Sequence, residues 1–129
     1  MTKPLVRPAC AGLWDTPMVH VNGDVTTCCL DEHLENKIGN LSEQPLDEIW
    51  NSQQMNRWRV AQIEGRFEDS GPLCLRCNWR SAGGISEERA TLWLQTHKKK
   101  TERKEHAPSK RKRMLYWLRR VLITPRNIE

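Results

Sequence analysis

Five cysteines constrain this chain of 129 residues more than any other feature of its sequence. Cys10 stands alone, Cys28 is followed directly by Cys29, and Cys74 and Cys77 form a Cys-x-x-Cys pair. An odd number of cysteines fits a disulfide framework poorly. The N-terminal stretch lacks the apolar run of a signal peptide, so we expect a cytoplasmic protein with reduced thiols. Thiols brought together in such a protein are candidate ligands for a metal ion or an iron–sulfur cluster.

Composition divides the chain into a small body and a basic extension. Hydrophobic residues make up 37% of the sequence, with one Phe, one Tyr and six Trp, so the core is small and a metal would help to stabilise it. Residues 1–96 carry 9 Lys/Arg against 13 Asp/Glu, whereas residues 97–129 carry 12 against 3. We therefore expect a folded domain over residues 1–97 and a basic linker with a helical tail over residues 98–129.

A β-hairpin is the clearest local prediction. Residues 18–21 and 24–29 are rich in β-branched side chains, and Asn22-Gly23 between them favours a two-residue turn in which both positions have positive φ. This hairpin would bring Cys28 to the end of its second strand. Because successive strand residues face opposite sides, Cys28 and Cys29 cannot both face one site. Cys29 is then a small buried hydrophobe, or the ligand in place of Cys28.

Short helices are predicted after the hairpin, which makes the fold class α+β. Residues 30–40 are expected to form a polar loop, and Ser42 to cap a helix whose inner face carries Leu46, Ile49 and Trp50. Further helices are predicted over about residues 52–64, with Met55 and Trp58 inward, and from Ser86 to about residue 97, with Leu92 and Trp93 as its apolar positions. Residues 98–113 are expected to form a solvated linker, and residues 114–122 an amphipathic helix.

The spacing of the thiols narrows the chemistry without deciding it. A Cys-x-x-Cys pair serves zinc sites, iron–sulfur clusters and redox dithiols. A redox dithiol usually lies in a thioredoxin-like βαβ pattern, which this sequence lacks. A structural zinc site usually takes two tight pairs, whereas here one pair is joined by dispersed cysteines. The arrangement suits an iron–sulfur cluster and leaves zinc as the alternative. It also leaves open that His20 or His33 replaces one of the thiols as a ligand.

Taken together, these motifs resemble the SPASM/twitch auxiliary domains of radical SAM enzymes. The resemblance covers about residues 10–80 and rests on the cysteine spacing, on Gly23, and on the segments 21–25, 38–41, 46–51 and 72–74. It implies an α+β fold in which a hairpin and short helices surround one iron–sulfur cluster. It further implies that this [4Fe-4S] cluster is held by Cys10, Cys28, Cys74 and Cys77.

Two departures from that family's pattern shape the expected function. The sequence has no Cys-x-x-x-Cys-x-x-Cys motif, and the nine residues before Cys10 cannot hold a radical SAM barrel, so we expect no enzymatic activity from this chain alone. No cysteine follows Cys77, which implies the version with one cluster. With four protein thiolates no iron is open to substrate, which favours electron transfer or structural support. Trp14 and Trp79 lie near ligands in sequence and are expected to pack in the core.

The expected partner is a separate radical SAM enzyme or its peptide substrate. The rival hypothesis is a zinc-stabilised interaction or nucleic-acid-binding protein in which the basic tail carries the function. Aromatic side chains do not interleave with the charges of residues 98–120, which disfavours nucleic acid as a ligand. A basic helix with one apolar face better suits docking on a partner protein or on an anionic membrane surface.

Overall fold

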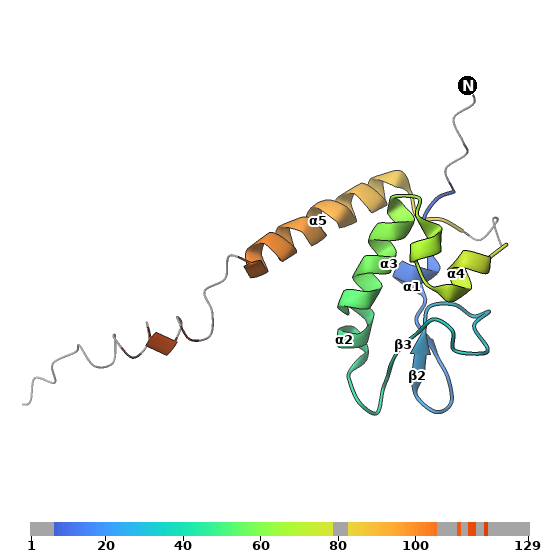
Figure 1. Ribbon diagram of the computed structural model, residues 1–129, viewed down its shortest axis with the longest axis horizontal. Coiled ribbons are helices and arrows are strands. Elements are labelled where there is room, and N and C mark those ends of the chain that lie inside the picture. Colours follow the sequence, from blue (N-terminus) through green and yellow to red (C-terminus); the bar gives the residue numbers. More distant parts are fainter. Residues whose placement is uncertain (1–6, 79–82, 106–110, 112–113, 116–117, 119–129) are drawn as a thin grey trace, which may run out of the picture. The chain divides into compact units, whose positions relative to one another are not determined.

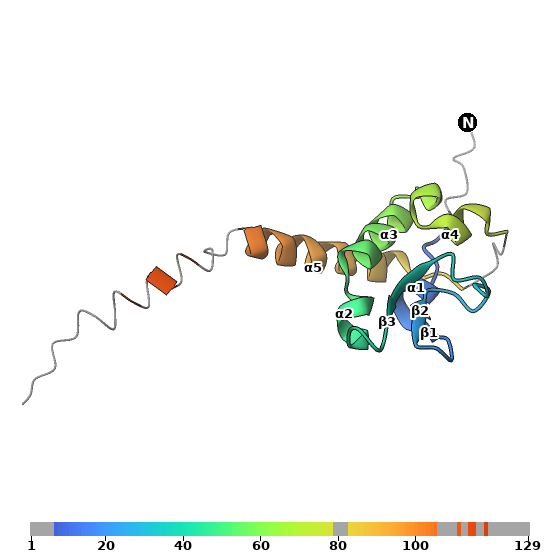
Figure 2. The same cartoon turned by 60° about the horizontal axis from the view of Figure 1, so that its bottom comes forward.

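The computed structural model describes residues 7–78, 83–105, 111, 114, 115 and 118. The chain divides into two units, Met1–Leu94 and Gln95–Glu129, which are described separately. Figures 1 and 2 show an α+β arrangement in which several helices gather next to one end of a small sheet. The elements, in chain order, are α1 (Gly12–Asp15), β1 (Met18–Val19), β2 (Asp24–Thr26), β3 (Lys37–Asn40), α2 (Leu46–Trp50), α3 (Gln53–Ile63), the 3-10 helix η1 (Phe67–Asp69), α4 (Pro72–Arg76) and α5 (Glu87–Glu105).

The sheet contains the predicted hairpin and a third strand that the sequence pattern did not predict. The order is β1-β2-β3 with antiparallel pairing, Val25 lying opposite Val19 on one side and Gly39 on the other. The prediction that residues 30–40 form only a polar loop is therefore wrong over β3. This strand has one large apolar side chain, Ile38, so it shows no alternation of apolar and polar residues, and its pairing with β2 defines it.

The hairpin turn differs from the predicted two-residue turn. The Gly23 N–H donates to the His20 carbonyl oxygen at 2.9 Å, and Gly23 has a φ of 87°. Outside glycine, Leu34 is the described residue with a positive φ, so Asn22 does not adopt the left-handed conformation. The loop is thus a wider turn closed by a left-handed glycine. Asn22 instead donates through Nδ2 to Asp24 Oδ2 at 2.8 Å.

Two of the predicted helices follow the hairpin, with one corrected start. Ser42 does not cap α2: its hydroxyl donates to Asn40 Oδ1 at 2.7 Å, and Pro45 stands at the N-cap position. The start of α3 is capped as a helix N-terminus usually is, because the Ser52 hydroxyl accepts the Met55 N–H at 3.3 Å. Met55 and Trp58 are buried, as predicted.

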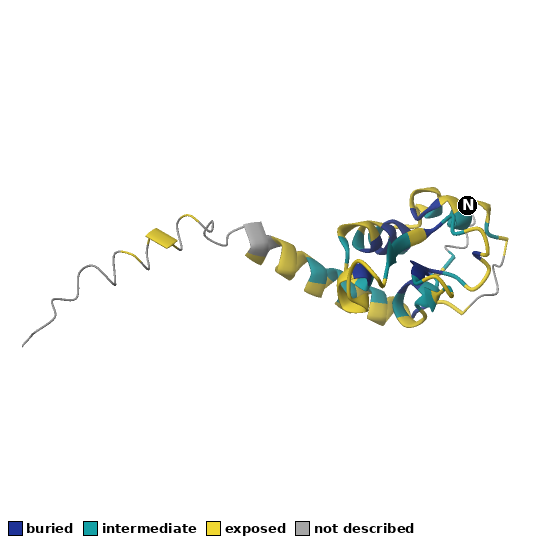
Figure 3. Cartoon of the chain, turned by 90° about the horizontal axis from the view of Figure 1, so that it is seen from below, coloured by how far each residue is buried: buried dark blue, intermediate teal, exposed yellow. Residues whose placement is uncertain are grey.

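The core joins α1 to α3 and contains a buried cation, Arg59. Figure 3 colours the chain by burial, with the buried residues in dark blue. Leu13 packs against the inner face of α3, while Cys10 and Trp14 pack at the edge of this cluster. Arg59 Nε donates to the Leu13 carbonyl oxygen at 2.9 Å, and its guanidinium lies over the Trp50 ring. Burial lowers the pKa of Arg59 to about 10, so the side chain remains charged at neutral pH and holds α1 against α3.

The last described helix corrects two predictions. Ser86 caps α5 as expected, but the helix continues to Glu105, past the predicted end near residue 97 and into the predicted linker. Of the two apolar positions predicted for this helix, Leu92 is 65% exposed, whereas Trp93 packs edge-on against Trp14 with the ring centroids 6.0 Å apart. The predicted 114–122 helix lies largely outside the described residues, as does Trp79. No described helix is long and apolar enough to cross a membrane.

Candidate metal centre

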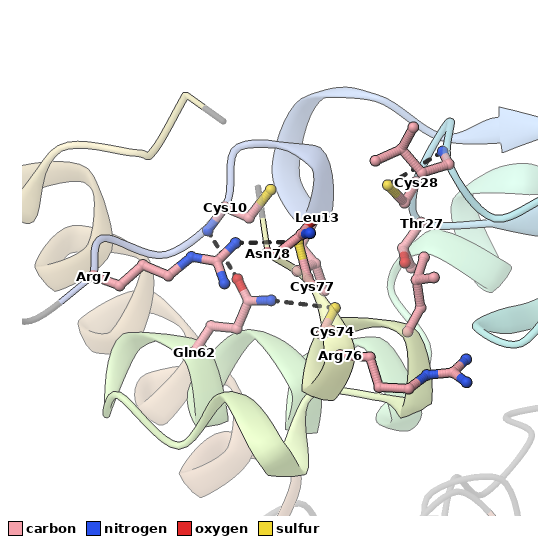
Figure 4. A pocket seen from close by; sticks show the side chains of 12 residues that line it. Arg7, Cys10, Leu13, Thr27, Cys28, Gln62, Cys74, Arg76, Cys77 and Asn78 are labelled. Atoms are coloured by element: carbon pink, nitrogen blue, oxygen red, sulfur yellow. Dashed lines mark hydrogen bonds between the residues drawn. The ribbon is translucent and has the colours of Figure 1, made fainter. Parts of the chain in front are cut away.

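Four of the five cysteines line one cavity of about 310 Å³ in the first unit (Figure 4). They come from three segments of the chain: Cys10 precedes α1, Cys28 follows β2, and Cys74 and Cys77 belong to α4 and its end. In Figure 4 the sulfurs face a common space, with Cys28 across from Cys10. All five cysteines are free thiols.

Cys10 is held by backbone contacts on both of its sides. It forms an isolated antiparallel bridge with Gly84, and the neighbouring Ala11 N–H donates to the Gly83 carbonyl oxygen at 2.9 Å. The Cys10 N–H itself donates to Gln62 Oε1 at 2.8 Å. The lead-in segment is therefore attached both to the residues before α5 and to α3.

Cys28 lies in a turn, two residues after the strand that leads to it. Its sulfur accepts the Leu30 N–H at 3.4 Å, and partial burial raises the pKa of its thiol. Cys29 is exposed and does not line the cavity, so the prediction that it is a buried hydrophobe is wrong. Because β2 ends at Thr26, strand alternation does not explain which of the two cysteines faces inward; the turn does.

Cys74 and Cys77 are placed by the short helix α4. Pro72 occupies its first turn, where the missing N–H costs nothing, and Cys77 stands at the C-cap with its N–H 3.3 Å from the Cys74 carbonyl oxygen. This geometry puts both thiols on the cavity side. Burial raises the pKa of the Cys74 thiol. Cys74 must therefore lose its proton to bind a metal as a thiolate.

Positive charge lies beside the thiols. Arg7 Nη2 donates to Cys77 Sγ at 3.5 Å, and its guanidinium lies 4.7 Å from the centre of the Phe67 ring. Arg76 also lines the cavity and forms an ion pair with Glu35. A cation next to several thiolates lowers the electrostatic cost of holding them together.

Two buried carboxamides complete the site, and sequence reasoning did not identify them. Gln62 and Asn36 each place an amide nitrogen within hydrogen-bond distance of Cys74 Sγ. Gln62 could have been found, because it is a polar residue seven positions after Met55 on the inner face of α3. Asn36 precedes β3 in a polar stretch and gives no such signal.

The donor set fits an iron–sulfur cluster better than one ion. Thiolates are the usual protein ligands of such clusters, and all four thiols border the same cavity. Among the described residues, no three His, Cys, Asp or Glu side chains converge closely enough to share a single metal ion. Neither His20 nor His33 lines the cavity.

These features define a small cysteine-rich domain built around a cofactor cavity. The model of the SPASM iron–sulfur cluster-binding domain matches residues 10–78, more than half of the chain. The chain belongs to this family and is an iron–sulfur cluster-binding domain, which confirms the predicted resemblance. No curated protein and no solved structure matches the chain. The zinc alternative gains no support from the family.

Proposed function

We propose that Cys10, Cys28, Cys74 and Cys77 together hold one [4Fe-4S] cluster. The observation that carries this proposal is that these thiols, from three separate segments, border one cavity of about 310 Å³. Four thiolates on one zinc ion would each lie about 2.3 Å from the metal and leave little space between them. The cavity is many times the ~10–15 Å³ that accommodates one water molecule, so it suits a larger group.

A [4Fe-4S] cluster with four protein thiolates supplies one-electron transfer and leaves no iron open to a substrate. The residues around the cavity have roles consistent with that chemistry. Leu13 and Leu73 cover the thiols with apolar surface, and Arg7 compensates negative charge beside Cys77. Both effects influence the reduction potential of a bound cluster.

The domain then acts as an accessory to a separate radical SAM enzyme, as an electron-transfer module or as a binding module for that enzyme or its peptide substrate. The sequence has no Cys-x-x-x-Cys-x-x-Cys motif, which supports an accessory role over catalysis. The basic residues 98–129 are the proposed docking segment, directed to an acidic face of the partner or to an anionic membrane surface.

Anaerobic purification tests the cluster. The protein should be brown, with about four iron and four sulfide ions per chain, and changing both Cys74 and Cys77 to Ala should remove the colour. Folding of the variant is checked by circular dichroism. A colourless protein with one stoichiometric zinc ion would contradict the proposal and restore the zinc hypothesis.

The docking segment is tested separately. Lys98, Lys99 and Lys100 lie in α5 and are exposed, so changing all three to Gln removes charge without a large change of helix propensity. If the membrane is the target, the unmodified protein should sediment with anionic vesicles and not with neutral ones, and the variant should bind less. Equal binding of both proteins would exclude these lysines from membrane docking.

A further inference from the structure

Two buried carboxamide side chains converge on one thiol of the cavity. Asn36 Nδ2 lies 3.4 Å and Gln62 Nε2 lies 3.6 Å from Cys74 Sγ. The two side chains are 0% and 2% exposed, and they come from the loop before β3 and from α3. Among the described residues, no cysteine other than Cys74 has two side-chain amides at its sulfur.

Gln62 links Cys74 to the segment that carries Cys10. Its Oε1 accepts the Cys10 N–H at 2.8 Å, which fixes the orientation of the amide, because only the oxygen can accept. Its two amide hydrogens are then available to Ser70 Oγ at 3.3 Å and to the sulfur. One side chain thus bridges two cysteines that are 64 positions apart in the chain.

Asn36 makes the equivalent link on the other side of the cavity. Its Oδ1 accepts the Leu73 N–H at 3.0 Å, and its Nδ2 reaches both Thr27 Oγ1 at 3.3 Å and the sulfur. Thr27 directly precedes Cys28, so this side chain joins that segment to α4. A Cβ on Gly71 would lie 2.6 Å from Asn36 Oδ1, which shows how closely the amide is enclosed.

We propose that Gln62 and Asn36 are positioning residues that make Cys74 a doubly hydrogen-bonded ligand and thereby raise the reduction potential of the bound cluster. This inference rests on the proposed function. An N–H directed at a ligating sulfur stabilises the reduced state more than the oxidised state, because the reduced state carries more negative charge. Amides that served only to satisfy backbone groups would not need to reach the sulfur.

Gln62→Met tests the contact with a neutral, similarly shaped side chain that can neither donate nor accept there. The matched control is Gln53→Met, the same change at an exposed position of α3. Asn36→Leu tests the second amide. The reduction potential of the cluster is measured by dye-mediated titration, and the stretching frequencies of the bonds between iron and cysteine sulfur are measured by resonance Raman spectroscopy.

We expect the potential to fall in Gln62→Met and Asn36→Leu, the iron–sulfur stretches to move to higher frequency, and Gln53→Met to match the original protein. A tenfold loss in the equilibrium constant for reduction would appear as about 59 mV for one electron. The reduction potential of Gln62→Asn, whose shorter amide cannot reach as far, should lie between those of Gln62→Met and the original protein. This variant serves in place of Gln62→Met if Gln62→Met does not fold. Loaded variants with unchanged potential and frequencies would overturn the inference. An original protein without a cluster would instead overturn the proposed function.

Discussion

The two sides of the cavity hold their thiols in different ways. Cys74 lies on a helix, and two buried side chains from distant parts of the chain reach its sulfur. Cys28 lies in a turn, and its sulfur accepts a hydrogen bond from the backbone two residues later. Its neighbours in the turn, Cys29 and Leu30, are exposed, the latter to 48%.

This difference separates a rigid side of the site from an accessible one. An amide side chain whose oxygen and nitrogen bond to different segments holds the ligand in place. Moving the ligand would leave these buried polar groups without partners. A turn stabilised by its own backbone adjusts at lower cost. We therefore expect the Cys74 side to set the properties of a bound cluster and the Cys28 side to be where a partner approaches it.

The largest expected effect separates the cavity-lining thiols from the exposed one. Replacing Cys74 or Cys28 by Ser should remove most of the bound iron, because a neutral hydroxyl is a poor substitute for a thiolate ligand. Cys29→Ser is the matched control, one residue away and outside the cavity. Iron and sulfide analysis after anaerobic purification measures the result. Loss of iron in Cys29→Ser with retention in Cys28→Ser would show that the other thiol of the turn is the ligand.

A glycine on the Cys74 side gives the next largest effect. Gly71 has a φ of 115°, and a Cβ there would meet the enclosed Asn36 amide, so Gly71→Ala should combine backbone strain with displacement of that side chain. We expect a loss of about 3 kcal/mol in the free energy of unfolding. Gly65→Ala is the control: its φ is 78°, but no atom lies within 4 Å of the added methyl group. It should cost only about 1 kcal/mol of strain. Equal losses in chemical denaturation would show that the amide is not tightly held.

On the Cys28 side a single carboxylate organises the loop. Asp31 is buried and accepts the Glu35 N–H at 2.8 Å, the Asn36 N–H at 2.9 Å and the Thr26 hydroxyl. Asp31→Ala should lower the free energy of unfolding by about 2 kcal/mol, because it leaves buried donors without a partner. The exposed neighbour Glu32→Ala should change it by less than about 0.5 kcal/mol. If both variants behave alike in denaturation, the loop depends on its backbone alone.

Much of the fold could be predicted because its signals are local. The hairpin follows from β-branched runs around Asn22-Gly23, and α3 from the apolar stripe that contains Met55 and Trp58. The third strand could not be predicted, because residues 37–40 become a strand by pairing with β2 rather than by their own pattern. The end of α5 could not be predicted for a different reason: a run of charged residues is compatible with an exposed helix as well as with a linker.

The candidate site was predicted to the level of its cysteines but not of their partners. That Cys28 rather than Cys29 faces the cavity agrees with the expectation, but the reason given, strand alternation, does not apply beyond Thr26. The amides of Gln62 and Asn36 depend on segments that meet only in the folded chain. A sequence shows which side chains can donate hydrogen bonds, while tertiary structure decides which acceptors they reach.

The smallest expected effect concerns the hairpin that leads to the accessible side. Lys37 and Asn40 bond to the carboxylate of Asp24 and lower its pKa to about 2. A depressed carboxylate pKa stabilises the fold fully above the unfolded value, near 4, and this contribution is lost as the pH falls from about 4 to 2. Asp24→Asn should therefore be less stable than the original metal-free protein at pH 6, and the difference should shrink below pH 4 and vanish only below pH 2. Urea denaturation at each pH measures it, with the exposed Asp47→Asn as control. If the difference in the free energy of unfolding stayed constant down to pH 2, the effect of Asp24 would come from hydrogen bonding rather than from its charge.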